Sequence, residues 1–128
     1  MGLNERLCAA VTPIVSVCVP ERYEAAAGET PAEEYCTYNY FDRAMMFANG
    51  RPRRIVRDYQ LHYVLPSGTN PEPTKQRLLY ALVCAGFAVA GIQDASETDK
   101  DDADIFGAPV QHWVFEFQGR EEIRYGDI

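Results

Sequence analysis

The sequence predicts an α+β domain with a mostly antiparallel sheet, two helices packed on one face of it and a long β-hairpin arm. Three observations predict this class. Strand-like segments follow one another without intervening helices, only two segments have helical spacing, and one pair of strands is longer than a small core needs. At 128 residues, the chain has the length of a single domain, here residues 1–128.

The sequence of the N-terminal third predicts a helix, a strand and a loop, in that order. From Asn4 to Thr12 the apolar residues recur at helical spacing, with Asn4 as a possible N-cap and Pro13 as a stop. The β-branched run Ile14–Val19 predicts a buried strand. Glu21–Glu34 predicts a loop, because small residues, glycine and proline interrupt every period.

The next segments predict the hairpin arm. Tyr35–Phe41 and Arg53–Leu65 are rich in aromatic and β-branched residues, which favour strands. Between them, Asp42–Pro52 predicts a connection that turns at Asn49-Gly50, a dipeptide that tolerates positive φ. At about 3.3 Å per residue the second strand would run roughly 40 Å. We therefore expect the hairpin of residues 35–65 to reach beyond its own globule.

A second helix follows a cluster of helix-breaking residues, Pro66–Pro73. Thr74 is its expected N-cap and Gly86 its C-terminal stop. Its apolar stripe consists of Leu78, Leu79, Leu82 and Val83. We expect this stripe to pack against the sheet.

The C-terminal segments alternate between strand and polar character. Phe87–Ile92 predicts a short strand or an extended connection, and Gln111–Gln118 predicts a half-buried strand. Between them, Asp94–Asp104 carries six acidic residues and a single lysine, which indicates an exposed loop. The tail Gly119–Ile128 is expected to be polar and less ordered.

Charge and hydropathy exclude several classes of partner. Twelve Lys and Arg residues against 19 Asp and Glu residues give a net charge of −7, which argues against a domain that grips DNA phosphates. DNA passing along an acidic wall is still allowed. No apolar stretch is long enough to cross a bilayer, so no membrane partner is expected. The first residues do not have the pattern of a secretory signal, which predicts synthesis in a reducing cytoplasm.

Catalytic, cofactor and metal motifs are missing from the sequence. The cysteines Cys8, Cys18, Cys36 and Cys84 form no Cys-x-x-Cys pair, and we expect core or half-buried thiols. No phosphate-binding loop, nucleophile elbow or His-Glu-x-x-His motif occurs. We therefore predict no catalytic residue, no cofactor and no metal.

The two histidines, His62 and His112, are the basis of an alternative hypothesis, a small metal-dependent enzyme. Each lies on the polar face of an expected strand, where the pair could meet near Asp58 or Glu116 and form a carboxylate-rich metal site. Where the sequence has no metal-binding spacing motif, a histidine is more often a surface or interface residue than a metal ligand. We therefore favour the interpretation of both as surface or interface residues.

Two groups of residues are candidates for contacts with other chains. The tyrosine-rich strand offers Tyr38 and Tyr40 as interface residues. The one basic cluster consists of Arg51, Arg53, Arg54 and Arg57. Because the net charge opposes binding to nucleic acid, we favour a contact between these arginines and a neighbouring subunit over a contact with phosphates.

The acidic loop is the second candidate surface. Its central aspartates are Asp99, Asp101, Asp102 and Asp104. Carboxylates at this density cannot be buried without partners, so they would face a channel or a partner ring, or simply form a solvated connection.

Three segments together resemble a known family. They are Leu-Asn-Glu-Arg-Leu-Cys-Ala-Ala-Val at residues 3–11, Tyr-Gln-Leu-His-Tyr-Val-Leu-Pro-Ser-Gly-Thr-Asn-Pro-Glu-Pro-Thr-Lys-Gln-Arg-Leu-Leu at 59–79, and Ala-Gly-Phe at 85–87 followed by the acidic loop and Gln-His-Trp-Val-Phe-Glu-Phe at 111–117. Their order and spacing are similar to those of the small tail-terminator, or tail-completion, proteins of long-tailed bacteriophages.

The resemblance implies a structural virion protein rather than an enzyme. Proteins of that family form a ring, generally hexameric, that caps the tail tube and joins it to the head connector or stopper protein, with DNA passing through the centre. The expected location is the tail or neck of the virion, after synthesis in the bacterial host cytoplasm. A tail-tube or head-closure ring protein is the main alternative.

Overall fold

The computed structural model describes residues 2–24, 32–48, 50–96 and 110–122. These contain two helices and one five-stranded sheet, with the sheet order β1-β2-β3-β5-β4. The elements in chain order are α1 (Leu3–Val11), β1 (Cys18–Pro20), β2 (Tyr35–Ala48), β3 (Arg51–Pro66), α2 (Glu72–Cys84), β4 (Ala88–Asp94) and β5 (Val110–Glu122). Only β1 and β2 pair in parallel, so the predicted α+β class with a mostly antiparallel sheet is confirmed.

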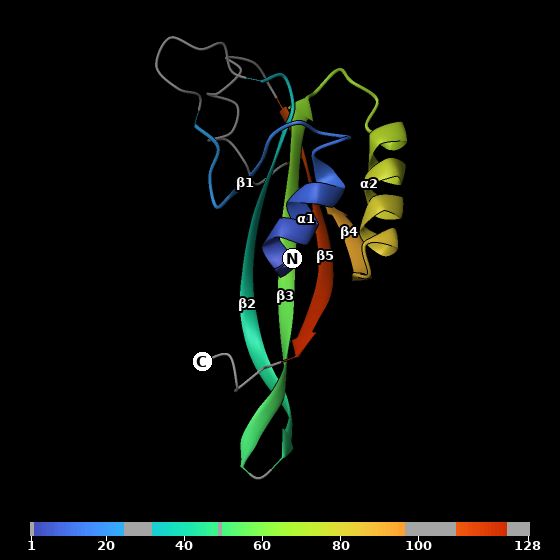
Figure 1. Cartoon of the computed structure of the whole chain (residues 1–128). Coiled ribbons are helices and arrows are strands. Elements are labelled where there is room, and N and C mark those ends of the chain that lie inside the picture. Colours follow the sequence, from blue (N-terminus) through green and yellow to red (C-terminus); the bar gives the residue numbers. More distant parts are fainter. Residues whose placement is uncertain (1, 25–31, 49, 97–109, 123–128) are drawn as a thin grey trace.

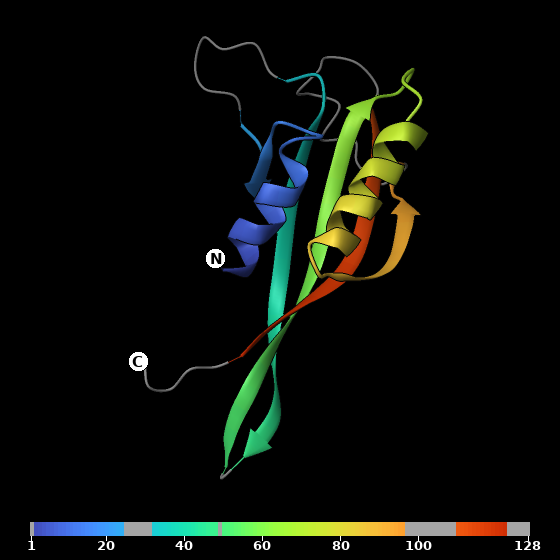
Figure 2. The ribbon, with the colours of Figure 1, turned by 45° about the vertical axis from the view of Figure 1, so that its right-hand side comes forward.

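Both helices lie on the same face of the sheet (Figures 1 and 2). Leu7 of α1 and Leu82 of α2 are fully buried in one apolar cluster with residues of β2, β3 and β5. Tyr59 of β3 is central to this cluster, because its ring stacks on Phe117 with centroids 5.1 Å apart and meets Phe87 edge-on at 5.8 Å. Burial of these side chains is the main source of stability for the fold.

Two side chains expected as helix caps do not serve as caps. Gly2 and Pro71 occupy the N-cap positions, without a capping side-chain hydrogen bond, and Asn4 and Thr74 lie inside their helices. Before α2, the side chain of Asn70 accepts a hydrogen bond from the backbone N–H of Glu72 at 3.2 Å. Proline also fits the first turn of this helix, since its missing N–H would be unpaired there anyway.

The predicted strand Ile14–Val19 is mostly wrong. Only Cys18–Pro20 pairs with β2, as β1. The backbone N–H groups of Ile14 and Val15 instead donate to the carbonyl oxygen of Val11, at 2.9 Å each, and turn the chain at the end of α1. Val15 is buried there. The residues of this run are therefore apolar partly because they pack under the end of α1 and partly because they form a strand.

The two strands of the hairpin are longer than predicted, although the hairpin itself covers nearly the expected residues. The supposed connection Asp42–Pro52 is mostly strand, because β2 continues to Ala48 and β3 begins at Arg51. Gly50, at the turn, has φ +74°, the left-handed conformation that glycine adopts without strain. The sixteen residues of β3 correspond to a length of about 50 Å at about 3.3 Å per residue.

The C-terminal strand is also longer than predicted. Gly119–Glu122 belongs to β5 rather than to a less ordered tail, and residues 123–128 lie outside the described residues. A Cβ at Gly119 would lie 2.8 Å from Leu3 Cδ2 and 2.9 Å from Phe87 Cε1, so a glycine lets the strand pass closely under the helix layer. Phe87–Ile92 is confirmed as a strand, β4.

Two expected burial assignments also change. Val83, placed in the apolar stripe of α2, is 54% exposed, whereas Leu78 and Leu82 are fully buried. Cys84 is exposed, while Cys36 is buried and Cys8 and Cys18 are partly buried. Within the described parts of the chain, neither helix is long and apolar enough to span a membrane.

Candidate assembly interface

The arm, defined as residues 39–48 and 50–58 of the β2–β3 hairpin, projects from the helix-covered part of the sheet (Figure 1). It begins where β1 ends, because the last pair between β1 and β2 is Pro20 with Tyr38. From Asn39 on, no described strand lies along the outer edge of β2. The pairing between β2 and β3 continues to Ala48 opposite Arg51.

Ion pairs brace the arm across its two strands. Arg43 donates from Nε and Nη2 to the carboxylate of Asp58, at 2.6 and 3.2 Å. Arg57 donates in the same forked way to Asp42, at 2.6 and 3.0 Å. The hydrogen bond from Arg43 lowers the pKa of Asp58, so this carboxylate stays ionised at neutral pH. Such bidentate pairs are directional and hold the two strands in one register.

A polar contact anchors the arm to α1. The Asn4 Oδ1 atom accepts hydrogen bonds from Arg57 Nη1 at 3.1 Å and from the Tyr59 hydroxyl at 2.5 Å. The guanidinium of Arg57 also lies 4.2 Å from the centroid of the Tyr40 ring. The hydrogen bond with Asp42 raises the pKa of Arg57 further, so its charge is permanent. The direction of the arm is thereby fixed relative to the helix layer.

Two aromatic rings are exposed at the base of the arm. Tyr40 is 42% exposed and Phe41 is 62% exposed. Because successive residues of a strand point to opposite faces, the two rings are presented on different sides of the sheet. Exposed aromatic side chains beside arginines have the composition of protein interfaces rather than of ordinary surface.

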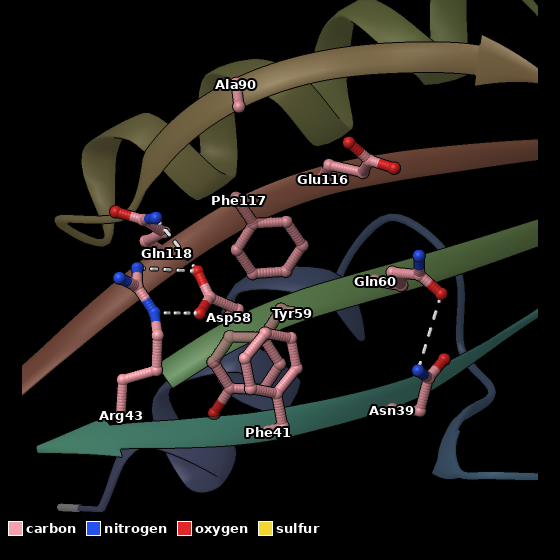
Figure 3. Close-up of a pocket in the computed structure, with 10 residues that line it drawn as sticks. All are labelled: Asn39, Phe41, Arg43, Asp58, Tyr59, Gln60, Ala90, Glu116, Phe117 and Gln118. Atoms are coloured by element: carbon pink, nitrogen blue, oxygen red, sulfur yellow. Dashed lines mark hydrogen bonds and ion pairs between the residues drawn. The ribbon is translucent and has the colours of Figure 1, made fainter. Parts of the chain in front are cut away.

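Phe41 lies at a hollow of about 490 Å³ formed by β2, β3, β4 and β5 (Figure 3). The lining mixes polar and charged side chains with three aromatic rings. The lining residues are Asn39, Phe41, Arg43, Asp58, Tyr59, Gln60, Ala90, Glu116, Phe117 and Gln118. Gln118 Nε2 donates to Asp58 Oδ1 at 2.8 Å, which extends the Arg43 ion pair from the arm to β5. The hollow therefore combines an exposed ring with a fixed network of charges and amides.

The two histidines meet, as their positions suggested. His62 Nδ1 and His112 Nε2 are 2.7 Å apart, and His62 Nε2 lies 2.8 Å from Asn39 Oδ1. Burial, and next the neighbouring His62, lower the pKa of His112 to about 4, so this imidazole is neutral at pH 7. The carboxylate of Asp58 is bound to Arg43 instead, and the described residues hold no group of three or more metal-ligating side chains. The pair is a hydrogen-bonded link between β3 and β5.

The interface residues expected from the sequence differ in whether their side chains are exposed, buried or bound within the chain. Tyr38 is buried in the core beside the Tyr59 ring, so its side chain is covered and the exposed tyrosine is Tyr40. Arg57 is bound to Asp42 within the arm. Arg51 is exposed and Arg54 is half-buried; the side chain of Arg53 and the aspartates Asp99, Asp101, Asp102 and Asp104 lie outside the described residues.

Phe41, Asp42 and Arg43 were not among the expected interface residues. Strand alternation could have placed Phe41 on the face opposite Tyr40, but the ion pairs depend on the register between β2 and β3. Neither models of known protein families nor curated protein sequences match this chain.

Proposed function

We propose that this chain is a structural virion protein, a tail-terminator subunit that forms a ring on the tail tube and joins it to the head connector. The observation that carries the proposal is the arm, which projects beyond the helix-covered core and has exposed aromatic rings at its base. The resemblance of the sequence to tail-terminator proteins supplies the identity of the ring.

The arm is suited to docking because its shape is set before any partner arrives. Arg43 and Arg57 are each held by a carboxylate on the opposite strand, and Asn4 anchors the second pair to α1. A rigid surface loses little conformational entropy on binding, so more of the contact energy contributes to affinity. Tyr40 and Phe41 then supply apolar area that water would otherwise cover.

A ring is one of the two kinds of assembly that such an arm can build. When an arm docks on a different surface of the next copy, the interface is heterologous, and such contacts close into rings or continue into filaments. The net charge of −7 suits a ring through which DNA passes, because an acidic wall does not hold phosphates. A tail-tube protein would use the same contact to build filaments.

The test is the state of assembly of the purified full chain, measured by light scattering and by electron microscopy, alone and with isolated tail tubes. We expect closed rings, or rings seated at one end of each tube. Long tubes formed by this chain alone would favour the tail-tube alternative. A chain that stays monomeric and leaves tube ends bare would contradict the proposal.

A further inference from the structure

Two cysteines that are ten residues apart in sequence face each other between α1 and β1. The Cys8 and Cys18 Sγ atoms are 3.8 Å apart, and the Cys8 thiol also lies 3.7 Å from the Cys18 carbonyl oxygen. Both residues are partly rather than fully buried. Neither thiol has a role in the proposed assembly.

We propose that Cys8 and Cys18 are an oxidisable thiol pair, which a small-molecule disulfide such as oxidised glutathione converts to an intramolecular disulfide. A disulfide has an S–S length near 2.05 Å, so the two side chains must rotate to bring the sulfur atoms closer by about 1.8 Å. The bond would tie the first helix to the first strand.

The reaction balances through thiol exchange. The Cys8 thiolate attacks one sulfur of the oxidised glutathione, forms a mixed disulfide and releases one glutathione thiolate. The Cys18 thiol then loses its proton, attacks the Cys8 sulfur and releases the second glutathione. The two protein thiols together lose two electrons and two protons, and one glutathione disulfide is reduced to two thiols.

The surroundings of Cys18 predict a slow reaction with a durable product. Burial, and next the neighbouring Cys8, raise the pKa of the Cys18 thiol, so its thiolate is scarce at neutral pH and the second step is slow. The same burial offers no stabilisation to a thiolate in the reduced protein, which favours the disulfide once it has formed. The rate should therefore rise with pH.

The pairing has a competitor in Cys36, which lies opposite Cys18 in the parallel pair of β1 and β2. Cys36 is fully buried in the core, whereas Cys8 is partly exposed. Only Cys8 has a thiol within 4 Å of Cys18 among the contacts of the described residues. Access and distance both favour the bond from Cys8.

Trypsin separates the possible products. It cuts after Arg6 and Arg22, so one peptide carries Cys8 and Cys18, while Cys36 and Cys84 lie on two other peptides. The Cys8–Cys18 bond therefore appears as a peptide lighter by two hydrogen atoms, which alkylation before digestion does not label. A Cys84→Ser background removes the exposed thiol, which would otherwise form bonds between molecules.

The experiment treats the Cys84→Ser protein with oxidised glutathione at pH 8 and follows peptide masses and thermal unfolding. We expect the lighter peptide, and a rise in Tm of roughly 5–10 °C because the bond closes a short loop in the unfolded chain. Reduction with dithiothreitol should reverse both changes. Cys8→Ala and Cys18→Ala, each checked for cooperative unfolding, should abolish both.

Three outcomes would overturn the proposal: a crosslink between Cys18 and Cys36, stable glutathione adducts without a crosslink, or no reaction in the folded protein. All three outcomes are measured on the purified chain alone, so they do not depend on whether the chain forms rings. Under the proposed function, the particle leaves a reducing cytoplasm for an oxidising medium, and the bond would then form after assembly; this consequence alone rests on that function.

Discussion

The helix-covered face of the sheet and the arm share strands β2 and β3 but are held in place by different forces. Around Tyr38 and Leu61 these strands are fixed by apolar burial under α1 and α2. Toward the turn, the same strands are fixed by the Arg43–Asp58 and Arg57–Asp42 ion pairs, with aromatic rings left in solvent. The first region supplies stability, while the second supplies shape.

The difference in burial sets the energy scale of each region. Apolar burial contributes about 25 cal/mol per Å², so a fully buried side chain stabilises by a few kcal/mol. Ion pairs near solvent contribute at most about 1 kcal/mol. The arm therefore adds little to the stability of its own chain, which is why we assign it a role in contacts with other chains.

The largest expected effect is on the helix-covered face. Leu82→Ala removes a fully buried side chain and should lower the free energy of unfolding by about 2–5 kcal/mol. Val83→Ala, one residue further along α2 at an exposed position, should change it by less than about 0.5 kcal/mol. Urea unfolding of both variants measures the difference, and equal losses would show that this helix does not pack as described.

An effect of pH on stability, of intermediate size, should arise at His112, on the face of the sheet opposite the helices. Its pKa is about 4 in the folded protein against 6.5 normally, so between those values the unfolded chain binds a proton that the folded chain does not. The contribution of His112 to the free energy of unfolding should be constant above pH 6.5. It should fall by up to about 3 kcal/mol as the pH drops to 4.

Unfolding midpoints at intervals across that pH range test this expectation. The pKa values of Asp58 and Asp94 are lowered from 3.8, so these carboxylates lose their contribution mainly below pH 4, the lower end of the window. His112→Gln should remove most of the slope between pH 6.5 and 4. An unchanged slope in that variant would mean that other groups carry it.

A smaller effect is expected where the two regions join. Asn4→Ala removes the acceptor of the Tyr59 hydroxyl, a buried group, and of Arg57, and should cost about 1–2 kcal/mol. Glu5→Ala, at an exposed position on the same helix, is the matched control and should be near neutral. If chemical denaturation gives the same midpoint for both variants, the arm is not anchored through Asn4.

The smallest effect on stability is expected at the exposed ring of the arm. Phe41→Ser should change the free energy of unfolding by less than about 0.5 kcal/mol, because the side chain is already mostly in solvent. The same variant should weaken assembly strongly, by about 1–3 kcal/mol per contact, if Phe41 is a central interface residue. Parallel measurement of unfolding and of oligomer mass separates the two effects.

The core could be predicted from the sequence better than the arm, for a physical reason. Hydrophobic periodicity is local, so the burial of Leu78 and Leu82 followed from spacing, and strand alternation placed His62 and His112 on polar faces from which they could meet. The Arg57–Asp42 pair depends on which residues stand opposite each other across the hairpin, and periodicity carries no such information.

The same limit explains the errors in the sequence predictions. Asn4 has the residue type of a helix cap, but its oxygen is used by Arg57, 53 positions away in sequence. Asp42–Pro52 reads as a connection because its charges and glycine are typical of turns, whereas cross-strand ion pairs let the strands continue through it. Partners that are distant in the sequence decided both cases.

The role of the arm in assembly is tested most directly by the oligomer mass of a chain with a shortened arm. The variant deletes Met45–Arg54, joins Ala44 to Ile55, its partner in the register, through an Asn-Gly turn, and carries Phe41→Ser. It loses the tip and the exposed ring but keeps both ion pairs and the whole core. Light scattering should give a ring-sized mass for the full chain and a folded monomer, with nearly unchanged Tm, for the variant. Equal masses for the two proteins would contradict the claim that the arm is the assembly surface.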